Sequence, residues 1–150
     1  MGRTENRSGG QSGRRNGRRV RAPGKVLLAE DEVLIAELYQ SRLQLDGWSV
    51  RVARDGVEAL AMIQSDPPAI AVLDIQMPRL GGLDVLRVLR SHEETRALPV
   101  LILSNTNGGA PAAEARELGA LDWLVKVRTP PDELSRNIAQ HLGRRQDRSA

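Results

Sequence analysis

Five short apolar runs, each followed by a stretch with helical spacing, occupy the sequence between residues 25 and 142. The third run, 69–73, is continuously apolar, which is typical of a strand buried on both faces of a sheet. Strands that alternate with helices favour a parallel α/β sheet with helices on both faces. Because five units are too few to close an eightfold barrel, the sequence predicts an open, doubly wound, five-stranded parallel sheet.

The positions of the elements follow from apolar spacing and from local start signals. Strands are expected at residues 26–29, 50–52, 69–73, 100–103 and 121–125, and a weak Ala-rich helix at 111–118. Asp55 and Glu58 have capping-box spacing, and Thr129 followed by two prolines marks the start of the last helix. The helical stripes expected to face the sheet are Leu34, Ile35 and Leu38; Val57, Leu60 and Ala61; Val85, Val88 and Leu89; and Leu134, Ile138 and Leu142.

Basic residues gather at the two ends of the chain. Residues 1–24 contain seven arginines and one acid among Gly, Ser and Asn, so we expect a disordered Arg/Gly-rich arm that has almost nothing to bury. Residues 143–150 form a short basic tail. The whole chain has 22 Lys+Arg against 19 Asp+Glu, and the domain expected at 25–142 is therefore acidic.

The composition excludes several classes of protein. Without cysteine the chain cannot form a disulfide scaffold, a thiolate metal site or a cysteine nucleophile. No apolar run approaches the roughly 18 residues of a membrane-spanning helix. The basic N-terminus lacks the apolar stretch of a secretory signal. We therefore expect a cytoplasmic protein with no membrane span.

Polar side chains follow four of the five expected strands. Glu30 and Asp31 follow the first, Asp74 the third, Ser104 the fourth and Lys126 the fifth. In open parallel sheets, ligands bind beyond the carboxyl ends of the strands. Crowded carboxylates repel one another and favour a hard divalent cation such as Mg²⁺, while a lysine and a hydroxyl beside them favour a phosphoryl group. The middle carboxylate can itself act as a nucleophile and form an aspartyl phosphate.

Each of these residues alone also has an ordinary structural explanation. Asp74 after a strand fits a turn or cap residue, and Glu30 with Asp31 suits the positive end of a helix. Ser104 alone fits a turn, and Lys126 alone fits a solvated strand end. Their coincidence at one end of the predicted sheet is what favours a shared site.

Over residues 25–142 the sequence resembles the receiver domains of two-component response regulators. The resemblance rests on four motifs in order: Leu-Ala-Glu30-Asp31-Glu32, Val-Leu-Asp74-Ile-Gln-Met-Pro78 followed by Gly81-Gly82, Leu-Ile-Leu-Ser104, and Gly119-Ala-Leu-Asp-Trp123-Leu-Val-Lys126. Asp74 precedes Ser104 by 30 residues and Lys126 by 52, as in the family. The resemblance implies the flavodoxin- or CheY-like fold, with strand order 2-1-3-4-5.

The resemblance also implies roles for the residues at the strand ends. Asp74 matches the phosphoacceptor. Glu30 and Asp31 match the acidic pair that binds Mg²⁺ together with Asp74 and the backbone carbonyl of Gln76.

Three further matches concern the switch that follows phosphorylation. Ser104 matches the hydroxyl that turns toward the phosphoryl group, Lys126 matches the lysine that contacts this group, and Trp123 matches the aromatic residue whose rotamer reports the switch. The added charge would shift a pre-existing equilibrium of the last helix–strand–helix face.

Three residues depart from the family pattern. Val127 stands where the family usually has a proline, often with a cis bond; because a non-proline cis bond costs roughly 2.5–4 kcal/mol, we expect a trans bond and a reshaped loop. Asn105 replaces a residue that is usually small, and we expect it to restrict access to Asp74. Trp123 replaces the common Tyr or Phe, and its bulk favours a single orientation.

The leading hypothesis is a single-domain response regulator. It would receive a phosphoryl group on Asp74 from a histidine kinase or phosphotransfer protein, and it would catalyse its own phosphorylation and dephosphorylation. We expect no output domain after Leu142, so signalling would require docking of a downstream partner or onward transfer of the phosphoryl group.

Two alternatives remain open. A degenerate receiver would serve as a constitutive docking module and never accept phosphate. The Arg-rich arm would bind nucleic acid or an anionic surface through phosphates, without reading sequence. The arm also fits a solvated tail or a start codon placed too early.

Overall fold

The computed structural model describes residues 24–149, with side chains as far as Gly143. The strands are β1 (Lys25–Ala29), β2 (Ser49–Ala53), β3 (Ile70–Asp74), β4 (Val100–Ser104) and β5 (Asp122–Val125). The helices are α1 (Val33–Leu45), α2 (Gly56–Ser65), α3 (Gly82–Ser91), α4 (Gly109–Glu117), the 3₁₀ turn η1 (Lys126–Arg128) and α5 (Pro131–Ser149). All strand pairs are parallel, in the order β2-β1-β3-β4-β5, which confirms the predicted fold class and strand order.

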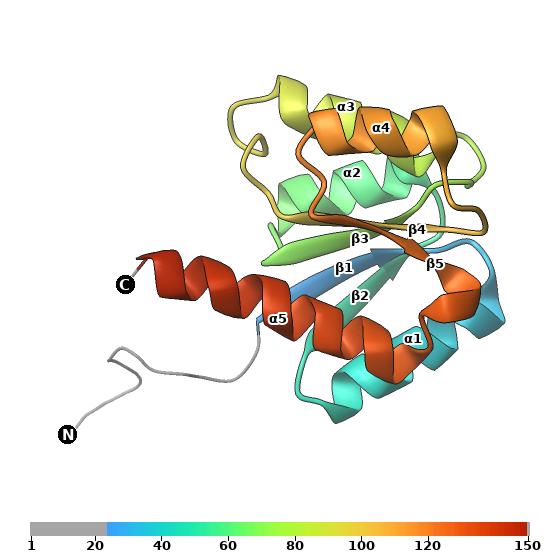
Figure 1. Ribbon diagram of the computed structural model, residues 1–150, viewed down its shortest axis with the longest axis vertical. Coiled ribbons are helices and arrows are strands. Elements are labelled where there is room, and N and C mark those ends of the chain that lie inside the picture. Colours follow the sequence, from blue (N-terminus) through green and yellow to red (C-terminus); the bar gives the residue numbers. More distant parts are fainter. Residues whose placement is uncertain (1–23, 150) are drawn as a thin grey trace.

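Helices cover both faces of the sheet (Figure 1). One core lies between the sheet and α1 with α5, and the other lies between the sheet and α2, α3 and α4. Every residue of β3 and β4 is buried, as expected for strands covered on both sides. The core is aliphatic, and its buried aromatic members, Tyr39 and Trp48, both pack on the α1 side.

The buried face of α1 differs from the prediction. Leu34 and Leu38 are 74% and 62% exposed, whereas the predicted Ile35 is partly buried against the core. The buried residues of this helix are Ala36, Tyr39 and Leu43. Apolar residues surround the first turns of this helix, so apolar spacing alone does not determine which side is buried. The small Ala36 is buried in place of the two leucines.

The remaining helices follow the prediction to different degrees. In α2 the buried residues are Gly56, Ala59 and Ile63, so the predicted Val57 and Ala61, both exposed, were wrong. The stripe of α3 is confirmed by buried Val85 and Leu89, and that of α5 by buried Leu134 and Ile138.

The capping box at the start of α2 is present in modified form. Asp55 accepts a hydrogen bond of 2.8 Å from Glu58 N–H, and Glu58 accepts one of 2.6 Å from Arg54 N–H. The reciprocal bond therefore reaches one residue before the cap.

The two ends of the chain differ in what the structure describes. The expected disordered arm at residues 1–24 lies, apart from Gly24, outside the described residues. The backbone of α5 continues to Ser149, through most of the segment expected to be a tail, because the single Gly143 costs a helix only about 1 kcal/mol. Within the described part of the chain, no helix is both long and apolar enough to cross a membrane.

Candidate functional site

The carboxyl ends of two adjacent strands bring three acidic side chains together. β1 and β3 are neighbours in the sheet, so Glu30 and Asp31, which follow β1, lie beside Asp74, the last residue of β3. One carboxylate oxygen from each residue lies within 4.8 Å of the others. Glu30 is completely buried and Asp74 is 3% exposed, whereas Asp31 is the most accessible of the three. The predicted crowding of carboxylates is confirmed.

Backbone hydrogen bonds orient these side chains. Glu30 N–H donates to Ala53 O at 2.9 Å, which extends the β1–β2 pairing one residue past the strand. The Glu30 carboxylate accepts from Glu32 N–H at 3.1 Å, and the Asp74 carboxylate accepts from Gln76 N–H at 3.3 Å. Both carboxylates are thus held above the ends of their own strands by the loop that follows each strand.

Lys126 reaches the cluster from the end of β5. Its ammonium nitrogen lies 2.8 Å from Glu30 Oε1 and donates a hydrogen bond of 3.1 Å to Asp74 Oδ2. The Lys126 side chain is only 9% exposed. One ammonium group therefore contacts two buried carboxylates, and with the carboxylate of Asp31 nearby the cluster carries an excess of negative charge.

The pKa values of the cluster reflect this confinement. Burial raises the pKa of Glu30 above its usual range, and contacts with Lys126 and with backbone N–H only partly oppose this. Burial likewise raises the pKa of Asp74, against the opposing effect of Lys126. For Lys126, burial lowers the pKa, but the contacts with Glu30 and Asp74 outweigh this and raise it. The ammonium form of the lysine is therefore secure, while the carboxylates lack full compensation.

The charge balance of the cluster shows that a cation fits. Glu30 Oε1 is buried, and its contact at 2.8 Å is with Lys126 Nζ, the same ammonium group that contacts Asp74. Buried carboxylates are costly unless each is paired with a charge or coordinates a metal, and here one ammonium group is shared by two of them. The available donors are all oxygens, which Mg²⁺ prefers. Glu30, Asp31 and Asp74 could hold such an ion, and the carbonyl ligand expected at Gln76 stays a prediction.

The predicted switch hydroxyl lies one strand away and is bonded elsewhere. Ser104 ends β4 and is 1% exposed. Its Oγ accepts a hydrogen bond of 3.0 Å from Thr106 N–H and lies 3.3 Å from the Thr106 hydroxyl. Among the described residues, the hydrogen bonds of this hydroxyl go to Thr106 and none to Asp74. The structure therefore keeps Ser104 next to the cluster but outside its hydrogen bonds.

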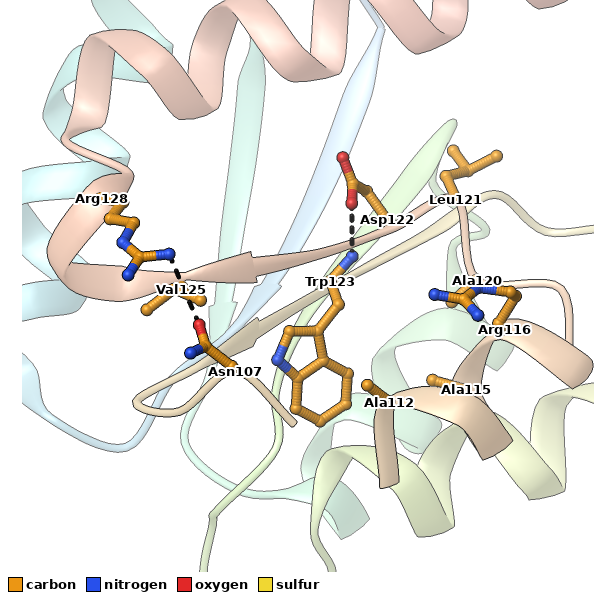
Figure 2. A pocket seen from close by; sticks show the side chains of 10 residues that line it. All are labelled: Asn107, Ala112, Ala115, Arg116, Ala120, Leu121, Asp122, Trp123, Val125 and Arg128. Atoms are coloured by element: carbon orange, nitrogen blue, oxygen red, sulfur yellow. Dashed lines mark hydrogen bonds between the residues drawn. The ribbon is translucent and has the colours of Figure 1, made fainter. Parts of the chain in front are cut away.

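Trp123 is joined to the same loop. Its indole N–H donates to Thr106 O at 2.8 Å, and the ring lies beside Ala112 of α4 (Figure 2). Gly108 has a φ of 105° and packs so closely that an added Cβ would lie 2.8 Å from the indole. Thr106 thus bonds both Ser104 and Trp123. Sequence reasoning missed Thr106, since a threonine in a loop carries no distinctive signal.

The two remaining departures lie at the rim of a pocket of about 310 Å³ between α1 and the β5–α5 loop. Val127 is 85% exposed in η1, and no cis peptide bond occurs in residues 24–149, so the expected trans bond is confirmed. Asn105 is exposed and lines the pocket together with Lys126. The expected restriction of access to Asp74 stays a prediction.

Comparisons with known proteins agree with this geometry. Residues 26–139 match the family model of the response regulator receiver domain. The chain is 41% identical over 102 residues to the response regulator MprA of Mycobacterium avium, and this match covers 68% of the chain and 44% of the relative. The chain thus spans less than half the length of that relative.

Solved structures show the same likeness. A response regulator from Chloroflexus aurantiacus gives a TM-score of 0.74 at 30% identity, with 81% of this chain and 98% of the other covered. The chemotaxis response regulator CheY4 of Vibrio cholerae gives 0.73 at 29% identity, with 80% and 98% covered.

Proposed function

The chain belongs to the family of response regulator receiver domains, and from that premise we propose that Asp74 accepts a phosphoryl group in a Mg²⁺-dependent reaction. One observation carries the proposal: the carboxylate of Asp74 ends the central strand between an acidic pair and an ammonium group, with Lys126 Nζ at 3.1 Å. A purely structural role does not account for two buried carboxylates around one lysine, because apolar residues of similar volume could be buried at a lower cost in free energy.

The donor is a phosphohistidine of a histidine kinase or phosphotransfer protein. An Asp74 carboxylate oxygen attacks the phosphorus, an O–P bond forms, and the P–N bond breaks. The electrons of the P–N bond go to the ring nitrogen, and the ring leaves as neutral imidazole because its other nitrogen carries a proton or the leaving nitrogen takes one from solvent. Glu30, Asp31 and Asp74, with the backbone carbonyl of Gln76, would hold a Mg²⁺ ion, which would supply charge neutralisation for an in-line transfer.

The residues of this chain then handle the new charge. Lys126 already bonds Asp74, and its ammonium group contacts the incoming phosphoryl oxygens with little movement. The Ser104 hydroxyl must leave Thr106 to donate to the phosphoryl group. Since Thr106 also accepts from Trp123, this movement loosens the indole and carries the signal to the α4–β5–α5 face.

The setting of the reaction follows from the donor. Phosphohistidine is formed from intracellular ATP, so we place this domain in the cytoplasm. Because the chain spans less than half of the MprA relative, its output is a partner, or a further part of a longer protein, that recognises the switched face.

Intact mass measured after incubation with acetyl phosphate and Mg²⁺ tests the proposal. We expect the wild type to gain one phosphoryl group only when Mg²⁺ is present, and Asp74→Asn to gain none. The matched control is Asp132→Asn, at an exposed aspartate in the first turn of α5, which should gain the group as the wild type does. A wild type that never gains mass would refute the proposal and support a degenerate, constitutive docking domain.

A further inference from the structure

The segment that carries Lys126 is fastened to α1 through one buried tyrosine. Tyr39 is 4% exposed, and its hydroxyl donates a hydrogen bond of 2.8 Å to the carbonyl of Thr129. Thr129 is itself 3% exposed; its hydroxyl donates to Val125 O at 2.8 Å and its N–H donates to Lys126 O at 3.0 Å. Hydrogen bonds therefore connect Tyr39 of α1, through Thr129, with the backbone carbonyls of Val125 and Lys126.

This fastening adds to the ion pairs of Lys126 itself and to a hydrogen bond of 3.5 Å from Arg128 to Asn107. Lys126 opens the short 3₁₀ turn η1, which follows the edge strand β5. The next residue, Val127, is 85% exposed and packs on almost nothing. Valine also lacks the ring by which a proline restricts the backbone at this position. The backbone position of Lys126 therefore depends in part on bonds made by neighbouring residues.

The chemistry of Tyr39 suits a permanent donor. Burial raises the pKa of its phenol, so the hydroxyl stays protonated and donates throughout the physiological range. Its helix begins at Val33, two residues after Asp31, so Tyr39 connects the element that follows the acidic pair with the segment that carries Lys126.

We propose that Tyr39 is a positioning residue for Lys126: its hydroxyl, acting through Thr129, holds the lysine against Glu30 and Asp74. The role in phosphorylation rests on the proposed function, whereas the positioning of the lysine does not. Tyr39→Phe is the natural variant, because the ring stays in the core and only the hydroxyl is removed.

The first test measures the lysine directly, without metal or phosphoryl donor. The chain contains two lysines, Lys25 and Lys126, so acylation by an amine-reactive reagent can be read at each by peptide mass spectrometry. Lys25 is half-exposed and serves as the internal reference. We expect Tyr39→Phe to raise the acylation rate of Lys126 relative to Lys25 by roughly three- to tenfold, the equivalent of one buried hydrogen bond.

A matched control separates positioning from general loosening. Ser135 is 5% exposed and donates a hydrogen bond of 2.6 Å to Asp46, also between α5 and α1 but at the far end of α1. Ser135→Ala removes one such bond and should leave the acylation of Lys126 unchanged. Equal Lys126 acylation in the wild type and Tyr39→Phe overturns the proposal, and so does an equal rise in Ser135→Ala.

The second test uses phosphorylation by acetyl phosphate. Tyr39→Phe should slow it by roughly three- to tenfold while calorimetry shows an unchanged affinity for Mg²⁺. Added to Lys126→Ala, the same change should slow phosphorylation no further, because both act through one group. An additive loss would overturn the proposal. A wild type that accepts no phosphate refutes the proposed function instead, and acylation still decides the role of Tyr39.

Discussion

The close approach of α3 to β3 predicts opposite effects for the same substitution at two glycines. A Cβ on Gly82, the first residue of α3, would lie 2.3 Å from the carbonyl oxygen of Asp74 and 3.2 Å from Cα of Ile75. Both contacts are with backbone, which the neighbouring strand holds in place through the bond from Ile75 N–H to Leu103 O at 2.9 Å. Neither partner can rotate away, so the strand or the helix must shift.

The expected magnitude follows from two opposing effects. Alanine favours a helix over glycine by up to about 1 kcal/mol, and overpacking of a dense site costs about 1–3 kcal/mol. Since an approach of 2.3 Å is far inside van der Waals contact, we expect the steric effect to dominate at Gly82. Gly82→Ala should therefore lower the free energy of unfolding by about 1–2 kcal/mol. Gly143, inside α5 with nothing within 4 Å of its Cβ position, should gain stability instead.

Urea unfolding of the wild type, Gly82→Ala and Gly143→Ala measures both effects in one assay. We expect the midpoint to fall in the first variant and to rise slightly in the second, with the slope unchanged. Gly82→Ala should also slow phosphorylation, because the shift reaches the backbone of Asp74. If Gly82→Ala is as stable as the wild type, then the helix and the strand are not packed as described and the reasoning fails.

Two further predictions concern charge. The hydrogen bond from Ser135 lowers the pKa of Asp46 below its ordinary value, so the stability that this bond adds is fully present above the ordinary pKa and is lost as the pH falls through the folded-state pKa. Ser135→Ala should therefore lower the free energy of unfolding, measured with urea, more near pH 7 than near pH 3. An equal loss at both pH values would contradict this prediction. Lys126→Ala leaves Glu30 and Asp74 buried without their ammonium partner, and without metal it should lower the free energy of unfolding by about 3–5 kcal/mol. Mg²⁺ should restore part of that loss, and a thermal melt that shows no response to the ion would count against a cation site.

The sheet could be predicted because its signal is local and strong. Continuous apolar runs such as 70–73 cannot be solvated, and each ends abruptly at a polar residue. Parallel strands put all of those endings on one edge, so the proximity of Glu30, Asp31, Asp74 and Lys126 follows from topology alone. Strand order came from the family resemblance, because no local pattern distinguishes one order of parallel strands from another.

Helix faces were harder to predict, for a physical reason that α1 illustrates. Its first turns are apolar on most sides, so the spacing of Leu34 and Leu38 fitted a buried stripe as well as the true one did. The true stripe includes Ala36, whose small side chain suits close packing on the sheet, and Tyr39, whose hydroxyl bonds a distant carbonyl. Both choices depend on partners far away in the sequence.

The arrangement of hydrogen bonds inside the site was out of reach for the same reason. Ser104 was expected beside Asp74, and its position on β4 agrees, but its hydroxyl bonds Thr106. Which partner a hydroxyl takes depends on a side-chain rotation and on the shape of the following loop. Residue types and spacings therefore predicted which groups meet, while the bonds between them required the structure.

The uncompensated charge of the site connects stability with function. Glu30 and Asp74 lie in a fold whose central strands are completely buried, and Lys126 neutralises only one of them. A cation that binds the folded protein and not the unfolded one stabilises it by mass action. In the proposed function, a phosphoryl group on Asp74 would change the balance of charge around Lys126 and would give Ser104 a partner stronger than Thr106. The same crowding that costs stability in the resting protein would thus make the site respond to a cation and to phosphorylation.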